Sequence, residues 1–225
     1  IGSINVTAIP TVAVNNATVC NGNAVTLTAS GATTYSWNTG AITSSISVTP
    51  STTTNYTVSG TTNGCSSSKT ATVNVNASPT VAVNSASVCS GSSSALSASG
   101  ATTYSWNTGA TTNSISVTPT TTTNYTVTGT TNGCSNSQVA TVSVTAGPTV
   151  SVSNSTICIG NNASLTASGA TTYSWNTGAT TSSISGLTVG SYSCTVFDAS
   201  NCSAVVAADI IPNGVQNIET LTSVS

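Results

Sequence analysis

The chain has 225 residues, and only Lys69, Asp198, Asp209 and Glu219 carry a side-chain charge at neutral pH. With neither Arg nor His, it has no basic surface to neutralise phosphates, which argues against nucleic acid and anionic lipid as partners. Its apolar runs are far shorter than the roughly 20 residues of a membrane-spanning helix, so we expect no transmembrane segment. It shows no initiator Met or signal-peptide pattern, and we expect it to be a mature or excised segment of a longer precursor.

The sequence repeats itself three times with a period of 69 residues. Pro-Thr-Val recurs at 10–12, 79–81 and 148–150, and a string of twelve residues is identical at 30–41, 99–110 and 168–179. A fixed period indicates one structural unit copied in tandem. We predict an orphan terminal strand at 1–9, repeats at 10–78, 79–147 and 148–211, and a C-terminal tail at 212–225.

Within the first repeat, apolar and polar residues alternate over short segments, which is typical of strands. Turn signals separate the segments, among them Asn38-Thr39-Gly40 and Asn63-Gly64. No helical periodicity is present, so six or seven short strands predict an all-β fold, an antiparallel β-sandwich in each repeat. The predicted strands are 11–15, 24–29, 34–38, 44–48, 53–59 and 70–76.

Six of the seven cysteines follow the period, with one pair in each repeat at a spacing of 45, 45 and 44 residues. We predict one disulfide within each repeat and therefore an oxidising, extracellular compartment. Zinc is the rival interpretation, but two thiols without His cannot complete a tetrahedral site. The predicted pairs are Cys20 with Cys65, Cys89 with Cys134, and Cys158 with Cys202.

Cys194 is left over and stands where the first two repeats have Val58 and Val127. We interpret it as a buried free thiol that fills an apolar position. Re-pairing with the nearby Cys202, or an intermolecular bond, is the alternative.

Each repeat has one tryptophan, 17 residues after its first cysteine. This Cys–Trp–Cys order is similar to that of immunoglobulin domains, in which the Trp packs in the core. Here the bridge would pin loops at one end of the sandwich instead of crossing its core. A ligand platform is the alternative role for the tryptophans. The predicted core aromatic residues are Trp37, Trp106, Trp175, Tyr56, Tyr125 and Tyr192.

The repeats resemble the immunoglobulin-like and PKD-like modules of Bacteroidota cell-surface adhesins. The likeness lies in Cys20-Asn-Gly-Asn, Tyr35-Ser-Trp-Asn-Thr-Gly and Asn63-Gly-Cys65. The third repeat, with Gly186-Leu-Thr-Val-Gly-Ser-Tyr192, looks like repeats of the large gliding-motility adhesins. The resemblance implies three tandem immunoglobulin-like antiparallel β-sandwich domains in an elongated array at the cell surface.

The tail from Asn213 to Ser225 is similar to the stretch that precedes the C-terminal sorting domain of type IX secretion cargo. That domain typically opens with Tyr-Pro-Asn-Pro, which is missing here. The resemblance implies export to the cell surface or release, with the chain ending near the point where the sorting signal is removed.

The first ten residues match the last strand of a repeat, because Ile4, Val6 and Ala8 stand at its apolar positions. The third repeat carries a last strand of its own at 204–211. The chain is therefore either a slice of a longer array, or it begins with a donor strand that completes a sheet in a neighbouring subunit. The candidate donor residues are Ile1, Ile4, Val6 and Ala8. Such a head-to-tail contact does not close, so it predicts self-association into a filament.

No constellation of catalytic residues is found, and we predict no enzymatic activity, no metal site and no cofactor. The first two repeats lack carboxylates, and Asp198 with Asp209 would supply only part of the six or more oxygens that calcium needs. Lys69 has no acid near it in sequence and reads as a solvated strand residue. Sequons that could carry surface glycans occur at Asn5, Asn16, Asn55, Asn124 and Asn162.

These observations predict an extracellular structural or adhesive protein that forms the shaft of a surface fibre or an adhesin stalk. One alternative is a glycan- or ice-binding module that uses Thr-rich faces such as Thr120–Thr123. Another is the accessory region of a larger secreted enzyme.

Overall fold

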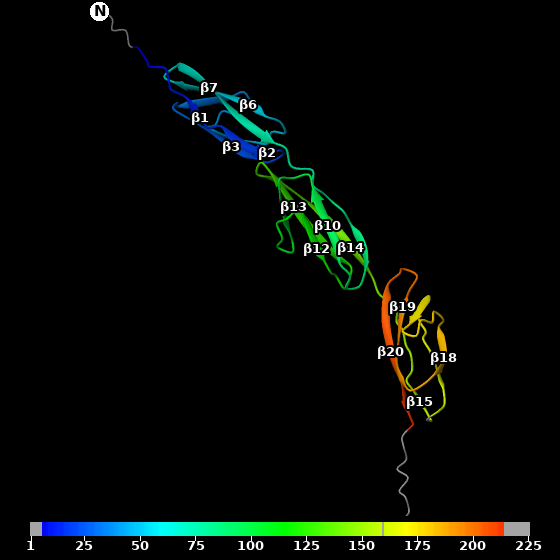
Figure 1. Cartoon of the computed structure of the whole chain (residues 1–225). Coiled ribbons are helices and arrows are strands. Elements are labelled where there is room, and N and C mark those ends of the chain that lie inside the picture. The colour runs from blue at the N-terminus through cyan, green and yellow to red at the C-terminus, as the bar shows by residue number, and fades with distance from the viewer. Residues whose placement is uncertain (1–5, 159, 214–225) are drawn as a thin grey trace, which may run out of the picture. The chain divides into compact units, whose positions relative to one another are not determined.

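The computed structural model describes residues 6–158 and 160–213, and every regular element in them is a β-strand. The chain folds as three immunoglobulin-like β-sandwiches, as the sequence predicted (Figure 1). It forms two compact units, and the boundary between them runs through the second repeat. Unit 1 takes Leu96–Ile115, Tyr125–Ala140 and the described part of Ile1–Asn84; unit 2 takes Ser85–Ala95, Ser116–Asn124 and the described part of Thr141–Ser225.

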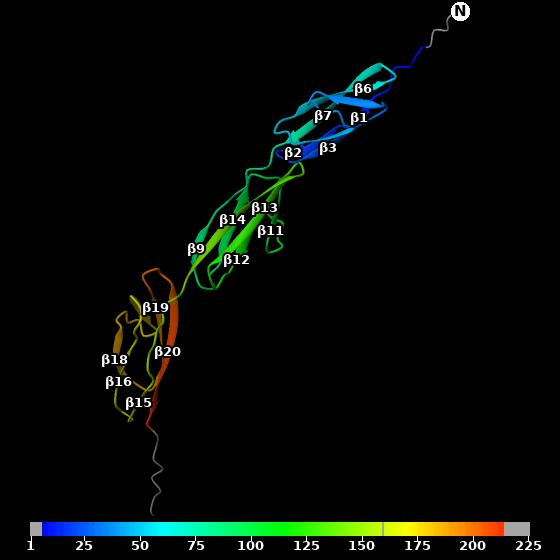
Figure 2. The same ribbon diagram turned by 180° about the vertical axis from the view of Figure 1, so that it is seen from behind.

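The first repeat contains seven strands in two sheets. The smaller sheet has the order β1-β3-β5 and the larger one β2-β7-β6-β4. Figure 2 labels β1, β2, β3, β6 and β7 of this repeat. All pairings are antiparallel except that of β2 with β7, which is parallel. The strands are β1 (Ala13–Val14), β2 (Ala17–Cys20), β3 (Val25–Ser30), β4 (Thr34–Trp37), β5 (Ser45–Val48), β6 (Thr54–Thr62) and β7 (Cys65–Asn76).

The second repeat has the same strand orders, β12-β10-β8 and β11-β13-β14-β9. Its strands are β8 (Ala82–Val83), β9 (Ala86–Cys89), β10 (Ser94–Ser99), β11 (Thr103–Trp106), β12 (Ser114–Val117), β13 (Thr123–Thr131) and β14 (Cys134–Thr145).

The third repeat has the sheets β16-β18 and β15-β20-β19-β17, so its last strand is its own, as predicted. Its strands are β15 (Ser155–Ile157), β16 (Ala163–Thr166), β17 (Thr172–Trp175), β18 (Ser183–Leu187), β19 (Gly190–Phe197) and β20 (Ser203–Pro212).

Where the sequence predicts a single strand at 11–15, the chain instead crosses from one sheet to the other. Asn15 finishes the β1 side, since its Oδ1 accepts a hydrogen bond from the backbone N–H of Thr28 at 2.7 Å. Asn16 begins the β2 side, since its Oδ1 accepts from the N–H of Thr72 at 2.8 Å. Side-chain amides thus replace ladder hydrogen bonds at the crossing. The strand that follows, β2, was not predicted.

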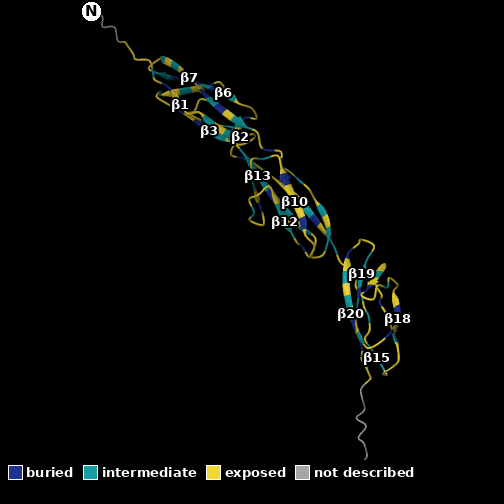
Figure 3. Ribbon diagram, in the orientation of Figure 1, coloured by how far each residue is buried: buried dark blue, intermediate teal, exposed yellow. Residues whose placement is uncertain are grey.

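In the first and third sandwiches the core is a cluster of buried residues that includes the tryptophan, and Figure 3 shows where buried residues lie along the strands. Trp37, Trp106 and Trp175 are each 3% exposed. Each indole N–H donates to a threonine carbonyl 2.9 Å away, which satisfies the polar edge of the buried ring. Among the tyrosines of the predicted core, Tyr56 is buried, whereas Tyr125 and Tyr192 are half-buried.

The solvent-exposed face of the β6–β7 pair carries a ladder of hydroxyl groups. Three cross-strand pairs lie within hydrogen-bond distance, at 3.0, 2.7 and 2.8 Å. Lys69, the only basic residue, is exposed on β7. Cross-strand hydroxyl pairs of this kind contribute roughly 0.2–1 kcal/mol each. The ladder is formed by Thr57 with Thr70, Ser59 with Ser68, and Thr61 with Ser66.

Replacing Gly31 by alanine should unfold the first sandwich more easily than the same change at Gly40. Both glycines have positive φ, 90° and 88°, but a Cβ at Gly31 would lie 2.0 Å from the carbonyl oxygen of Thr11, whereas Gly40 has nothing within 4 Å. We expect Gly40→Ala to cost about 1 kcal/mol and Gly31→Ala about 3 kcal/mol. Urea denaturation followed by tryptophan fluorescence measures both, and equal losses would contradict the close approach at Thr11.

Candidate functional site

Two disulfides bind consecutive repeats together. Cys20 of the first repeat bonds to Cys134 of the second, within unit 1, and Cys89 of the second bonds to Cys202 of the third, within unit 2. The Cα–Cα distance is 5.5 Å in both. The first cysteine of one repeat is therefore joined to the second cysteine of the next.

The predicted pairing within each repeat, Cys20 with Cys65, Cys89 with Cys134 and Cys158 with Cys202, is wrong. The reason is the parallel pairing of β2 with β7, which sets Cys20 opposite Asn76 at the end of β7. Cys65 is the first of the 12 residues of that strand, so it lies about 36 Å from Cys20 at the usual rise per residue. A disulfide needs Cα atoms within about 7 Å.

The other repeats have the same register. Cys89 pairs with Thr145 at the end of β14, the strand that Cys134 begins. In the third repeat Ile157, just before Cys158, pairs with Pro212, and Cys202 immediately precedes β20. The two cysteines of a repeat thus mark opposite ends of its long last strand.

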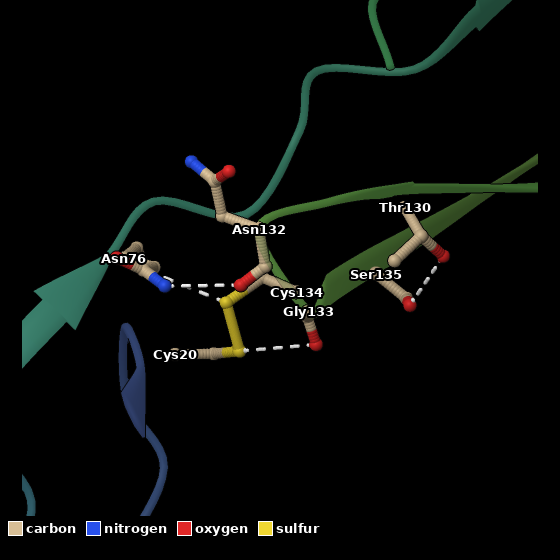
Figure 4. Close-up of a disulfide and its surroundings, with 7 residues drawn as sticks. All are labelled: Cys20, Asn76, Thr130, Asn132, Gly133, Cys134 and Ser135. Carbon is tan, nitrogen blue, oxygen red and sulfur yellow. Dashed lines mark hydrogen bonds between the residues drawn. A yellow bond between two sulfur atoms is a disulfide. The ribbon is translucent and has the colours of Figure 1, made fainter. Parts of the chain in front are cut away.

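Figure 4 shows how the second repeat meets the end of β7 in unit 1. The β13–β14 hairpin turns at Asn132 and Gly133, whose φ angles of 50° and 77° suit a tight two-residue turn. The side-chain amide of Asn76 donates to the carbonyl oxygen of Asn132 at 3.0 Å. The Sγ of Cys134 lies 3.8 Å from the carbonyl oxygen of Asn76. The hairpin tip is thus fixed to the end of β2 by the disulfide to Cys20 and to the adjoining end of β7 by the polar contacts of Asn76.

In unit 2 a carboxylate shapes the loop that presents Cys202. Asp198 Oδ1 accepts hydrogen bonds from the backbone N–H groups of Ser200 and Cys202, at 2.8 and 2.9 Å. Asn201 has a φ of 61°, as Asn132 has 50°. Asp198 therefore stabilises this turn. The carboxylate of Asp209 accepts a hydrogen bond from the hydroxyl of Ser191 at 2.6 Å. In the described part of the chain no three His, Cys, Asp or Glu residues gather to hold a metal ion.

Three cysteines are free: Cys65, Cys158 and Cys194. Cys194 is 0% exposed within the core of the third sandwich, and Cys202, its alternative partner, is bonded to Cys89. Burial raises the pKa of the Cys194 thiol above its ordinary value, although a backbone hydrogen bond with Ser174 lowers it in part. Cys158 is exposed and Cys65 half-buried.

The other candidate residues are placed as follows. Thr120–Thr122 lie between β12 and β13, and Thr123 begins β13. Two of these hydroxyls are used locally: Thr122 accepts from the N–H of Val144 and Thr123 donates to the carbonyl of Thr121. They form no outward array on a strand. The tryptophans lie in the core and offer no ligand platform. Among the candidate donor residues Ile1 and Ile4 lie outside the described residues, whereas Val6, 88% exposed, and Ala8 are exposed.

No family model matches the chain, and no curated protein matches it. Among solved structures, a three-domain immunoglobulin fragment from the I-band of titin is similar, at 12% identity over 93% of this chain and 100% of that one, with a TM-score of 0.43. Immunoglobulin domains 1–5 of Sidekick-1 match at 15% identity over 91% of this chain and 58% of that one, with a TM-score of 0.34. Among the described residues no helix has the length and apolarity needed to cross a bilayer.

The single lysine allows the disulfide pairing to be read directly. Lys69 follows both Cys20 and Cys65 but precedes Cys134. After alkylation of free thiols and tryptic cleavage in denaturant, we expect fragments 1–69 and 70–225 to stay together at the 21.9 kDa of the whole chain until a reductant separates them. Bonds within repeats would instead let them separate without reductant. A Cys20→Ser variant is the matched control and should separate at once.

The free thiols should differ in reactivity. Around pH 8, where an ordinary thiol is partly ionised, we expect the exposed Cys158 to react fast with a disulfide reagent and Cys194 to react only after denaturation. Raising the pH should leave Cys194 protected, because its raised pKa keeps the thiol protonated. Labelling kinetics of Cys158→Ser and Cys194→Ser assign the two phases. Fast loss of the Cys194 thiol in the folded chain would contradict its burial.

Proposed function

We propose that the chain is an extracellular structural or adhesive protein that forms the shaft of a surface fibre or the stalk of an adhesin. The observation that carries the proposal is the pair of disulfides between repeats, which need an oxidising compartment and join each sandwich covalently to the next. The proposal takes the three sandwiches to be the repeats at 10–78, 79–147 and 148–211. It assigns the protein no catalytic role.

The two disulfides together create a short covalent path along the chain. Cys20 leads to Cys134, the chain runs back from there to Cys89, and Cys89 leads to Cys202. Tension applied at the ends would follow this path and bypass residues 21–88 and 135–201. Unfolding of the first or the third sandwich would then release little length, and unfolding of the second would release at most the segment between Cys89 and Cys134. This limit on extension suits a load-bearing shaft.

The near absence of charge supports the same role. Copies of this chain would meet without strong electrostatic repulsion, and hydroxyl ladders replace ion pairs on the wet face of the sheets. Asn16, Asn55, Asn124 and Asn162 of the sequons are exposed, so surface glycans are compatible with the fold. Export by a Bacteroidota type IX system, as the sequence resemblance implies, belongs to this proposal.

Donor-strand pairing, the finer form of the proposal, meets one constraint. In the third repeat β20 already lies beside β15, with Ser155 opposite Ile210 and Ile157 opposite Pro212. A donor strand from a second copy would have to replace this end of β20. The exposed Val6 would gain the half-buried position that Val75 has in β7.

Electron microscopy of the native surface material, labelled with an antibody against this chain, tests the proposal. We expect the label along fibres or stalks outside the cell, because tandem sandwiches joined by disulfides form a continuous covalent structure. Antibody against an unrelated secreted protein serves as the control. Label confined to the cell interior, or to compact particles carrying an enzyme, would contradict the proposed function and favour an accessory region.

A further inference from the structure

We propose that Cys158 of one copy of the chain forms a disulfide with Cys65 of a second copy, so that the junction seen twice within the chain is repeated between chains. The partner is a second copy of this same chain, joined head to tail. The inference rests on the proposed function, because it supplies the covalent link of a fibre.

The order of the disulfides leaves one first cysteine of a repeat and one second cysteine of a repeat without a partner. The first cysteine of the first repeat bonds the second cysteine of the second repeat, and the same step leads from the second to the third. A further disulfide after the third repeat would start at Cys158, the first cysteine of that repeat. A further disulfide before the first repeat would end at Cys65, the second cysteine of that repeat. These two are the free thiols outside the core.

Cys65 already has the surroundings of a bonded cysteine. It follows the two-residue turn of Asn63 and Gly64, whose φ angles of 49° and 83° match the 50° and 77° before Cys134. Its Sγ lies 3.8 Å from the carbonyl oxygen of Thr7, as the Sγ of Cys134 lies 3.8 Å from that of Asn76. Thr7 and Asn76 are one period apart. The hairpin tip therefore has its bonded geometry before any partner arrives.

The difference between these sites is exposure. Cys134 and Cys202, bonded at their junctions, are each 1% exposed, whereas Cys65 is only half-buried. Cys158 is exposed, whereas its bonded counterparts Cys20 and Cys89 are half-buried. Both free cysteines thus lack the cover that a neighbouring repeat gives to the bonded ones.

The surface around Cys158 has the features of a vacant junction. β15 pairs in parallel with the end of β20 as β2 pairs with the end of β7. Asn213 comes next after this pairing, at the position of Asn76, and its side chain would donate to the carbonyl of Asn63 in the second copy as Asn76 donates to Asn132. A pocket beside Cys158 would receive the hairpin tip. It is lined by Ile157, Gly160, Asn161, Asn162, Thr188 and Val189.

The link does not depend on how the donor-strand question is answered. Thr7 of the second copy and Asn213 of the first both correspond to Asn76, so only one of them can lie beside Cys65. If Thr7 stays, the end of β20 has to give way to it; if Asn213 takes the place, residues 6–9, exposed and in no strand, move aside. Either arrangement brings Cys158 next to Cys65.

The bond forms by thiol–disulfide exchange with a small disulfide such as oxidised glutathione. The Cys158 thiolate attacks it, forms a mixed disulfide and releases one glutathione thiolate. The Cys65 thiolate of the second copy then attacks the Cys158 sulfur and releases the second glutathione. Two cysteine thiols are oxidised, one glutathione disulfide is reduced to two thiols, and these take up the two protons.

Two single variants of the full chain test the pairing by complementation. Cys65→Ser keeps Cys158, and Cys158→Ser keeps Cys65. In a glutathione redox buffer analysed by non-reducing electrophoresis, we expect the unmodified chain to give a ladder of multimers. Each variant alone should stay monomeric, and an equal mixture of the two should form a dimer and no larger species. Cys194→Ser is the matched control and should keep the full ladder.

Each of the following results would overturn the inference. The unmodified chain could stay monomeric and carry glutathione on both thiols. The Cys158→Ser variant alone could form as much dimer as the mixture. Mass spectrometry of the native material could find Cys65 bonded to a different protein. Labelled fibres or stalks without a Cys158–Cys65 bond would reject the inference and leave the proposed function standing. If the mixture of variants forms a dimer but the native material contains neither fibres nor stalks, the inference is supported and the proposed function is rejected.

Discussion

The parallel pairing of β2 with the end of β7 is the constraint on which the rest of the structure depends. It sets Cys20 opposite Asn76, at the far end of the strand that Cys65 begins. The two cysteines of a repeat are thereby kept too far apart to bond, and Cys20, Cys89, Cys134 and Cys202 bond to neighbouring repeats instead. A pairing of four residues thus converts a set of self-contained domains into a covalently joined series.

The sandwiches are stabilised almost entirely without charge. Each core is small, and its tryptophan satisfies its indole N–H on a nearby backbone carbonyl. Asparagine amides complete the ladders where the chain changes sheet, and hydroxyl pairs line the wet face of β6 and β7. Among the described residues no buried side-chain polar atom lacks a hydrogen-bond partner. Because these interactions are short-ranged, they should be little affected by salt.

The candidate site is the junction between consecutive repeats. The two aspartates accept local hydrogen bonds, and the hydroxyls of Thr122 and Thr123 bond to backbone groups of Val144 and Thr121. The hairpin tip has Asn and Gly before the cysteine in the first two repeats and Ser and Asn before it in the third. That tip positions a sulfur atom against the end of a strand.

The sequence by itself determined the period, the sandwich class, the buried tryptophans and the turns, because alternation, turn residues and a core aromatic act locally. It could not determine the cysteine partners, since a period of 69 residues makes bonds within repeats and between repeats equally regular. The deciding element, β2, is short and follows two asparagines that interrupt the alternating pattern. Only the tertiary structure placed it beside β7, where hydrogen bonds from Asn16 and the parallel register fix which end of the strand Cys20 faces.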